Sequence, residues 1–267
     1  MIEQSVITRY EEQTLQITVK TSEPMTLRLI VKDSDKDNTV FTDRLCPIED
    51  ELHTFYVRMP LCGNKSDILL FNPDNEDDNT GFEITKVVRA PLQKRLDLID
   101  FKNTQLKSFI RFSQRFSFNA GWMRTNDPEN PNDYYVSDDN QFFIKYLPVI
   151  TDENGNIEST PSRIETGSGL IDVSQEHFLG ATVPMREAIL LHEFAHIFLN
   201  ENPADETEAD LNSLLVYLAL GYPRIEAHEA WIGTFEDAPS EENLDRYEII
   251  EQFIKDFENN NLVIHGY

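Results

Sequence analysis

The sequence predicts an α+β protein in which an N-terminal antiparallel β-sandwich is followed by an α+β domain with a helical C-terminal part. Three observations indicate this fold class. The first ninety residues contain six short β-rich runs, hydrophobic residues then recur at helical spacing over residues 96–116, and helical patterns dominate after residue 184. Because 267 residues exceed the usual size of one hydrophobic core, we expect two domains, residues 1–92 and 93–267.

The β-sandwich is predicted from alternation and from turn chemistry. Apolar residues alternate with polar ones in residues 13–20 and again in residues 25–31, as in strands that bury one face. Polar, turn-forming clusters separate these runs from four others, which cover residues 39–45, 53–59, 67–71 and 82–88. No catalytic pattern occurs in this region, so we interpret it as a docking or binding module for a protein partner.

The second domain is predicted to open with the helix over residues 96–116 and to continue with strands at 141–150 and 169–173. Helices are expected at residues 184–199, 202–220, 223–231 and 240–259. For the second of these, Asn202 is a suitable N-cap, Pro203 suits the first helical position, and Gly221 suits the position just after the helix. Strands followed by helices in this order favour an α+β domain.

Charge is unevenly distributed along the chain. The net charge is −25, and residues 151–267 contain 5 Lys or Arg against 24 Asp or Glu. So acidic a surface repels phosphate backbones, which argues against nucleic-acid binding through the C-terminal half. It is interpreted either as a solubilising surface or as one that attracts cationic substrates or a basic partner.

Cellular location is inferred from cysteines and apolar segments. Cys46 and Cys62 form no CxxC pattern, and reduced thiols are the default for a cytosolic protein. The first residues lack the basic and apolar regions of a signal peptide, and the longest apolar run, 214–220, is too short to span a bilayer. We therefore expect a cytoplasmic protein with no membrane association.

Residues 192–196 read His-Glu-Phe-Ala-His, an HExxH motif within the helix expected at 184–199. Residues four apart lie on one helix face, so His192 and His196 can present both imidazoles to one metal ion. Neutral imidazoles suit zinc, and the adjacent Glu193 can take a proton from a water activated by that metal. The alternative is that both histidines are ordinary surface residues of the helix.

An acidic segment downstream offers a third ligand. If two antiparallel helices meet at a turn near residues 200–202, Glu206 lies level with His196 and Asp210 lies level with His192. Glu206 can then bind the metal while Asp210 accepts a hydrogen bond from a ligand imidazole. Glu208 is the main rival for the third ligand, and Asp205 is a weaker one.

This arrangement, HExxH followed by Glu206-Thr-Glu-Ala-Asp210, resembles the gluzincin metallopeptidases over residues 184–222. The resemblance implies a zincin-like domain that binds Zn²⁺ through His192, His196 and Glu206, with Asp210 supporting the first histidine. It also implies that an edge strand, here residues 170–173, aligns a peptide substrate. The metzincin pattern is absent, because its glycine and third histidine would fall at Leu199 and Asn202.

Zincins also need a group that stabilises the oxyanion opposite the base. His228 and Tyr222 lie just beyond the ligand-bearing helix and are the nearest candidates. Each has a simpler interpretation, since Tyr222 can pack at a helix end and His228 can be an exposed helical residue.

Two functions are consistent with these residues. The first is a zinc-dependent metallopeptidase that hydrolyses peptide bonds of a peptide or protein substrate. The second is an assembly protein with little or no proteolysis, because a β-module joined to a zincin-like domain is also similar to virion-associated ring, neck or tail proteins of tailed bacteriophages. In that case the chain would form oligomers or partner complexes and would be located in the virion.

Overall fold

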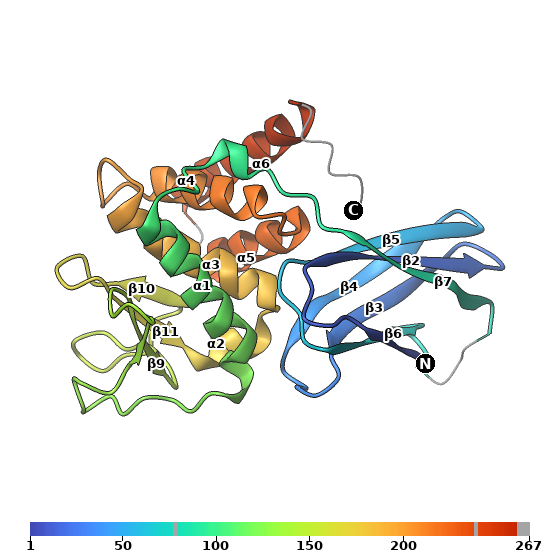
Figure 1. The fold of residues 1–267 in the computed structure, drawn as a ribbon, viewed down its shortest axis with the longest axis horizontal. Helices are drawn as coiled ribbons and strands as arrows, with labels where there is room; N and C mark the ends of the chain where they lie inside the picture. The colour runs from blue at the N-terminus through green and yellow to red at the C-terminus, as the bar shows by residue number, and fades with distance from the viewer. Residues whose placement is uncertain (77–79, 238–239, 261–267) are drawn as a thin grey trace. The chain divides into compact units, whose positions relative to one another are not determined.

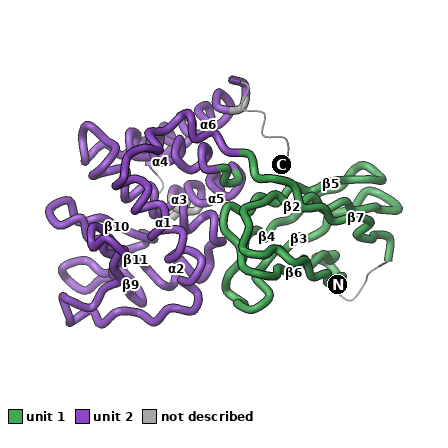
Figure 2. Tube along the Cα trace, viewed as in Figure 1, with its two compact units in different colours: residues 1–93, 221–223, 264–267 green, residues 94–220, 224–263 purple. Residues whose placement is uncertain are grey.

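The chain is described here by a computed structural model that covers residues 1–76, 80–237 and 240–260. It is a mixed α+β protein, as the sequence predicts (Figure 1). The described residues form two compact units (Figure 2). Of the described residues, unit 1 contains Met1–Gln93 and Gly221–Pro223, and unit 2 contains Lys94–Leu220 and those of Arg224–Val263.

Unit 1 contains two antiparallel sheets. The four-stranded sheet has the order β1-β6-β3-β4, with bounds Ile2–Ile7, Lys65–Phe71, Met25–Asp33 and Val40–Ile48. The three-stranded sheet has the order β5-β2-β7, with bounds Leu52–Met59, Gln13–Thr21 and Phe82–Pro91.

The central strands of both sheets bury alternate side chains. On β2 the fully buried side chains are Leu15, Ile17 and Val19, and β3 contributes Leu27, Leu29 and Val31 in the same way. One buried face on each sheet is the pattern of a β-sandwich. The sequence prediction missed β1, because this edge strand pairs only with β6 and is mostly exposed, so it lacks apolar alternation.

Unit 2 contains a mixed sheet of order β10-β11-β9-β8. The bounds in that order are Ser162–Ile164, Leu170–Ser174, Phe143–Leu147 and Tyr135–Val136. Strand β11 is parallel to β9 and antiparallel to β10. The expectation that residues 170–173 form an edge strand is therefore wrong, because β10 covers β11 and is itself the edge. Its three residues are too few to show a period in the sequence.

The helix expected over residues 96–116 begins later than predicted. A 3₁₀ turn occupies Leu96–Leu98, and helix α1 covers Thr104–Asn119. The side chain of Asn103 caps α1 by accepting hydrogen bonds from the backbone N–H groups of Gln105 and Leu106.

Five helices follow the sheet: α2 (Gln175–Gly180), α3 (Val183–Phe198), α4 (Glu206–Ala219), α5 (Arg224–Asp237) and α6 (Glu241–Asn259). Helix α3 packs against α1, α4 and α5. Helix α4 does not begin at Asn202 as expected, because Asp205 is its N-cap and accepts a hydrogen bond from the N–H of Glu208. Within the described ranges, no helix has the length and apolar character needed to cross a membrane.

Candidate metal centre

Helix α3 presents His192 and His196 on one face. Its N-terminus is fixed by Thr182, whose hydroxyl accepts a hydrogen bond from the N–H of Met185. Most of its other side chains are buried against neighbouring helices, which holds the helix and the two imidazoles in place. The Nε2 atoms of His192 and His196 are 3.0 Å apart.

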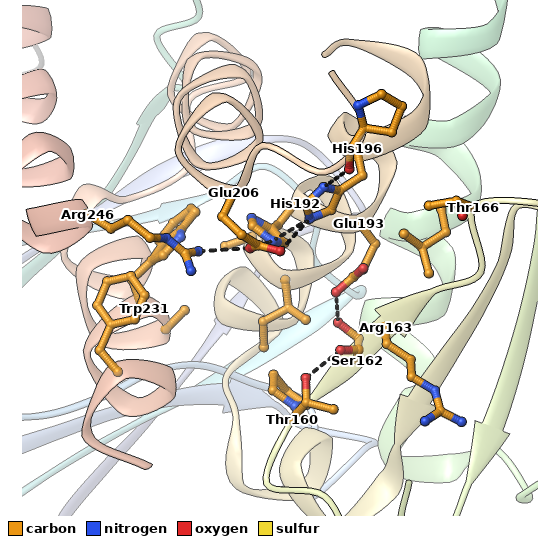
Figure 3. A pocket seen from close by; sticks show the side chains of 17 residues that line it. Thr160, Ser162, Arg163, Thr166, His192, Glu193, His196, Glu206, Trp231 and Arg246 are labelled. Atoms are coloured by element: carbon orange, nitrogen blue, oxygen red, sulfur yellow. Dashed lines mark hydrogen bonds and ion pairs between the residues drawn. The ribbon is translucent and has the colours of Figure 1, made fainter. Parts of the chain in front are cut away.

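Helix α4 brings Glu206 to the same place. Its Oε2 lies 3.3 Å from Nε2 of His192, and its Oε1 lies 3.6 Å from Nε2 of His196. The three side chains point toward one another, and their donor atoms all lie within 4.8 Å (Figure 3). Two nitrogens and one oxygen from adjacent helices thus form a candidate metal-binding triad, as the sequence predicts.

The outer nitrogen of each imidazole faces an acceptor. Nδ1 of His196 donates to the backbone carbonyl of Pro203 over 2.9 Å, and a carbonyl can only accept, so this nitrogen carries the proton. Nδ1 of His192 lies 3.0 Å from Oδ1 of Asp210, although its N–H is too oblique for a well-aligned hydrogen bond. Contacts of this kind leave both Nε2 lone pairs free for a metal.

The inner atoms of the cluster fit a cation. When both rings are neutral, two nitrogen lone pairs and a carboxylate face one another at 3.0–3.6 Å with no hydrogen to share. Among these side chains alone, burial lowers the pKa of His192, but contacts with Asp210 and Glu206 raise it to about 10. A proton or a metal ion relieves the repulsion, so the residues fit a bound cation.

Asp210 is the buried centre of a second group of contacts. Its carboxylate accepts from Nε1 of Trp231 over 2.8 Å and from Nε and Nη2 of Arg246 over 2.7 and 3.1 Å. Burial favours a higher pKa for Asp210, but His192 and Arg246 outweigh it and hold the pKa below its ordinary value. Asp210 therefore stays ionised beside the triad.

Arg246 and Trp231 were not found by sequence reasoning. The available signal was that Arg246 is the single Lys or Arg between Arg224 and Lys255, in a strongly acidic segment. A lone cation in such a segment is a candidate partner for a buried carboxylate.

Glu193 opens onto the same cavity as the triad. The cavity measures about 330 Å³ and is lined by β10 on one side and by apolar residues of α3 and α5 on another. Oε1 of Glu193 accepts a hydrogen bond of 2.7 Å from the hydroxyl of Ser162, the first residue of β10 (Figure 3). Ser162 is a further residue that sequence reasoning missed, since it lies 31 positions before Glu193.

The remaining predicted residues lie elsewhere. Glu208 turns back to the α3–α4 loop and accepts from the N–H groups of Glu201 and Asn202, so it is not part of the triad. His228 contacts the hydroxyl of Tyr247 and does not line the cavity. Tyr222 is buried, belongs to unit 1 and does not line the cavity either.

Comparisons of the chain with protein-family models, with curated proteins and with solved structures gave no match. What the site can do is therefore inferred from its own geometry and chemistry.

Proposed function

We propose that the chain is a zinc-dependent metallopeptidase of the gluzincin type. One observation carries the proposal: the triad of His192, His196 and Glu206 shares its cavity with Glu193, which is held by Ser162. A site that bound metal only for stability would need neither a further carboxylate beside the triad nor an open cavity.

Zinc is the metal that these donors suit best. Two imidazoles and one carboxylate form a ligand set found in catalytic zinc sites, with an open fourth position. The supporting contacts from Pro203 and Asp210 are those that orient ligand imidazoles. Softer metals would be favoured by thiolates, and both cysteines lie in unit 1.

The chemistry then divides between the metal and Glu193. When bound, zinc supplies a Lewis acid that polarises the substrate carbonyl and lowers the pKa of a water molecule. Glu193 accepts the proton from that water and returns it to the departing amine. Ser162 donates to one oxygen of Glu193 and so leaves the other oxygen for the proton.

The open edge of β10 fits an extended peptide substrate. The carbonyl of Pro161 and the N–H of Glu165 bond toward β11, so the backbone groups of Ser162 and Ile164 between them face away from β11. The Ser162 carbonyl is already bonded to the hydroxyl of Thr160, over 2.6 Å. Ile164 therefore offers both backbone groups for β-strand addition. It lines the cavity together with Thr160, Pro161 and Ser162.

Unit 1 is proposed to recruit a protein partner or the protein substrate, because its β-sandwich contains no triad of metal-ligating residues among the described residues. The strongly acidic C-terminal half favours a basic partner surface and disfavours nucleic acid.

Metal analysis combined with a peptidase assay tests the proposal. The purified chain is expected to contain one zinc ion and to cleave at least one member of a varied peptide library. Glu193→Ala should retain zinc and lose hydrolysis by about 100-fold or more, because a general base contributes on the order of 10²–10⁴. Glu176→Ala, at an exposed position on α2, is the matched control and should keep full activity.

Two outcomes would contradict the proposal. A chain without bound metal would remove its basis. Bound zinc with no cleavage of any peptide would favour the assembly protein, and a stable oligomer or partner complex should then be found.

A further inference from the structure

Arg246 bridges two carboxylates that lie one turn apart on α4. Its Nε and Nη2 contact Asp210, and Nη2 also lies 3.2 Å from Oε2 of Glu206. Arg246 comes from α6 and reaches Glu206 from the side away from Glu193 (Figure 3). A single guanidinium thus connects the third ligand to the carboxylate that supports the first ligand.

Glu206 is the less constrained of the two acids. Its side chain is 43% exposed, whereas that of Asp210 is 1% exposed. Asp210 also accepts a hydrogen bond from Trp231 and lies 3.0 Å from Nδ1 of His192, so several contacts hold it. Glu206 contacts only the two imidazoles and Arg246 among the described residues, and like charges one turn apart repel.

We infer that Arg246 is a positioning residue that holds Glu206 ready to bind the metal. The inference depends on the proposed metal centre but not on peptidase activity. In the absence of Arg246, repulsion from Asp210 and the favourable hydration of the Glu206 carboxylate would turn this carboxylate away from the imidazoles. Metal binding would then require the Glu206 side chain to move from solvent back to the two imidazoles.

A guanidinium beside a metal site also repels the metal, and this repulsion opposes the benefit of holding Glu206. The charge of Arg246 is balanced locally by the two-point ion pair with buried Asp210. The repulsion that a metal experiences is therefore largely cancelled, whereas the geometric hold on Glu206 is not. The net effect of Arg246 is to strengthen metal binding.

Zinc affinity measures this directly, without any substrate. Competition with a chromophoric chelator would be carried out on the full chain and on Arg246→Gln and Arg246→Lys. Arg246→Gln is expected to weaken zinc binding about 10- to 100-fold, as loss of a group that orients metal ligands commonly does. Arg246→Lys keeps the charge but not the fork, so a smaller, several-fold loss is expected.

A control and a double variant separate positioning from general damage to the fold. Arg124→Gln removes another two-point arginine–aspartate pair of unit 2, outside the cavity, and should leave zinc affinity unchanged. In a Glu206→Gln background, Arg246→Gln should cause much less further loss, because the residue it positions is already neutral. A merely structural role would give the same loss in both backgrounds.

The zinc affinities of the Arg246 variants decide whether the inference holds. Zinc affinity within twofold of the original chain in Arg246→Gln would overturn the inference. Tighter binding would also overturn it and would identify Arg246 as a cation that competes with the metal. If that variant fails to fold, an unchanged affinity in Arg246→Lys has the same consequence. An original chain that binds no zinc overturns both proposals, whereas zinc binding without hydrolysis overturns the peptidase alone.

Discussion

A buried carboxyl group lies beside each half of helix α3, and the two groups have different partners. At the C-terminal end, Asp210 of α4 is surrounded by Arg246, Trp231 and His192. At the N-terminal end, Glu187 is fully buried against α1, where its two oxygens accept from the hydroxyls of Ser113 and Ser117 over 2.7 and 3.1 Å. One acid has a cationic partner and the other has only neutral donors.

The difference decides which acid is ionised. Burial raises the pKa of Glu187 to about 8, and the two serine hydroxyls lower it only in part. The pKa of Asp210 stays below its ordinary value despite burial. Equal burial thus produces a neutral packing group at one end of α3 and a fixed charge at the other, and only the fixed charge can support a metal ligand.

Asp210→Ala should lower the free energy of unfolding more than any other substitution considered in this comparison. The substitution leaves the Arg246 guanidinium without its buried partner, which typically costs about 3–5 kcal/mol. Urea unfolding of the metal-free chain would measure the loss of unfolding free energy. Asp138→Ala removes an exposed aspartate paired with Arg115 and should change stability by less than about 0.5 kcal/mol. An equally small effect at Asp210 would show that the cluster does not hold the charge.

Glu187→Gln should change how the stability of the protein depends on pH. The folded-state pKa of about 8 lies above the ordinary 4.5, so the stability contributed by protonated Glu187 is present below pH 4.5 and is lost as the pH rises through 8. The whole loss is on the order of a few kcal/mol, since one pKa unit corresponds to about 1.4 kcal/mol.

The Gln variant, which cannot ionise, should lose this alkaline destabilisation and become the more stable protein above pH 8. Denaturant unfolding between pH 5 and pH 9 would measure the change. Glu176→Gln, at an exposed glutamate, should show the same change of unfolding free energy with pH as the original chain. The same slope in Glu187→Gln would assign the pH dependence to other groups.

Trp231→Phe should have the smallest effect, because it removes one donor to Asp210 and leaves Arg246 and His192 in place. A loss of about 1 kcal/mol in unfolding free energy is expected, together with zinc binding that is weaker by a few-fold. Trp122→Phe, at the other tryptophan of the chain, which is exposed, is the matched control and should change neither quantity. A loss as large as that of Asp210→Ala would mean that the indole, and not the guanidinium, holds the carboxylate.

Sequence reasoning reached the triad because its members are close together in the chain. Helical periodicity places His192 beside His196, and a short turn brings Glu206 level with them. It could not decide between Glu206 and Glu208, because that depends on where α4 begins. The choice of Asp205 rather than Asn202 as the N-cap turns Glu208 back to the loop.

The remaining parts of the site depend on tertiary structure. Ser162, Trp231 and Arg246 lie 21 to 40 positions from the carboxylates they contact, and no local period connects them. The same reason applies to the fold. Strands that bury one face were predicted, whereas exposed β1 and three-residue β10 carry no pattern that sequence reasoning can detect.

The carbonyl of Pro203, bonded to His196, has a consequence for the order in which the site forms during folding. This bond, the triad and the contact with Asp210 all close loops of fewer than twenty residues within one helical hairpin. The entropic cost of closing a loop grows with the separation of its ends. We therefore expect the triad side chains of this hairpin to come together early in folding. The contact from α6 closes a loop of 36 residues and should form last, after a metal-ready hairpin already exists.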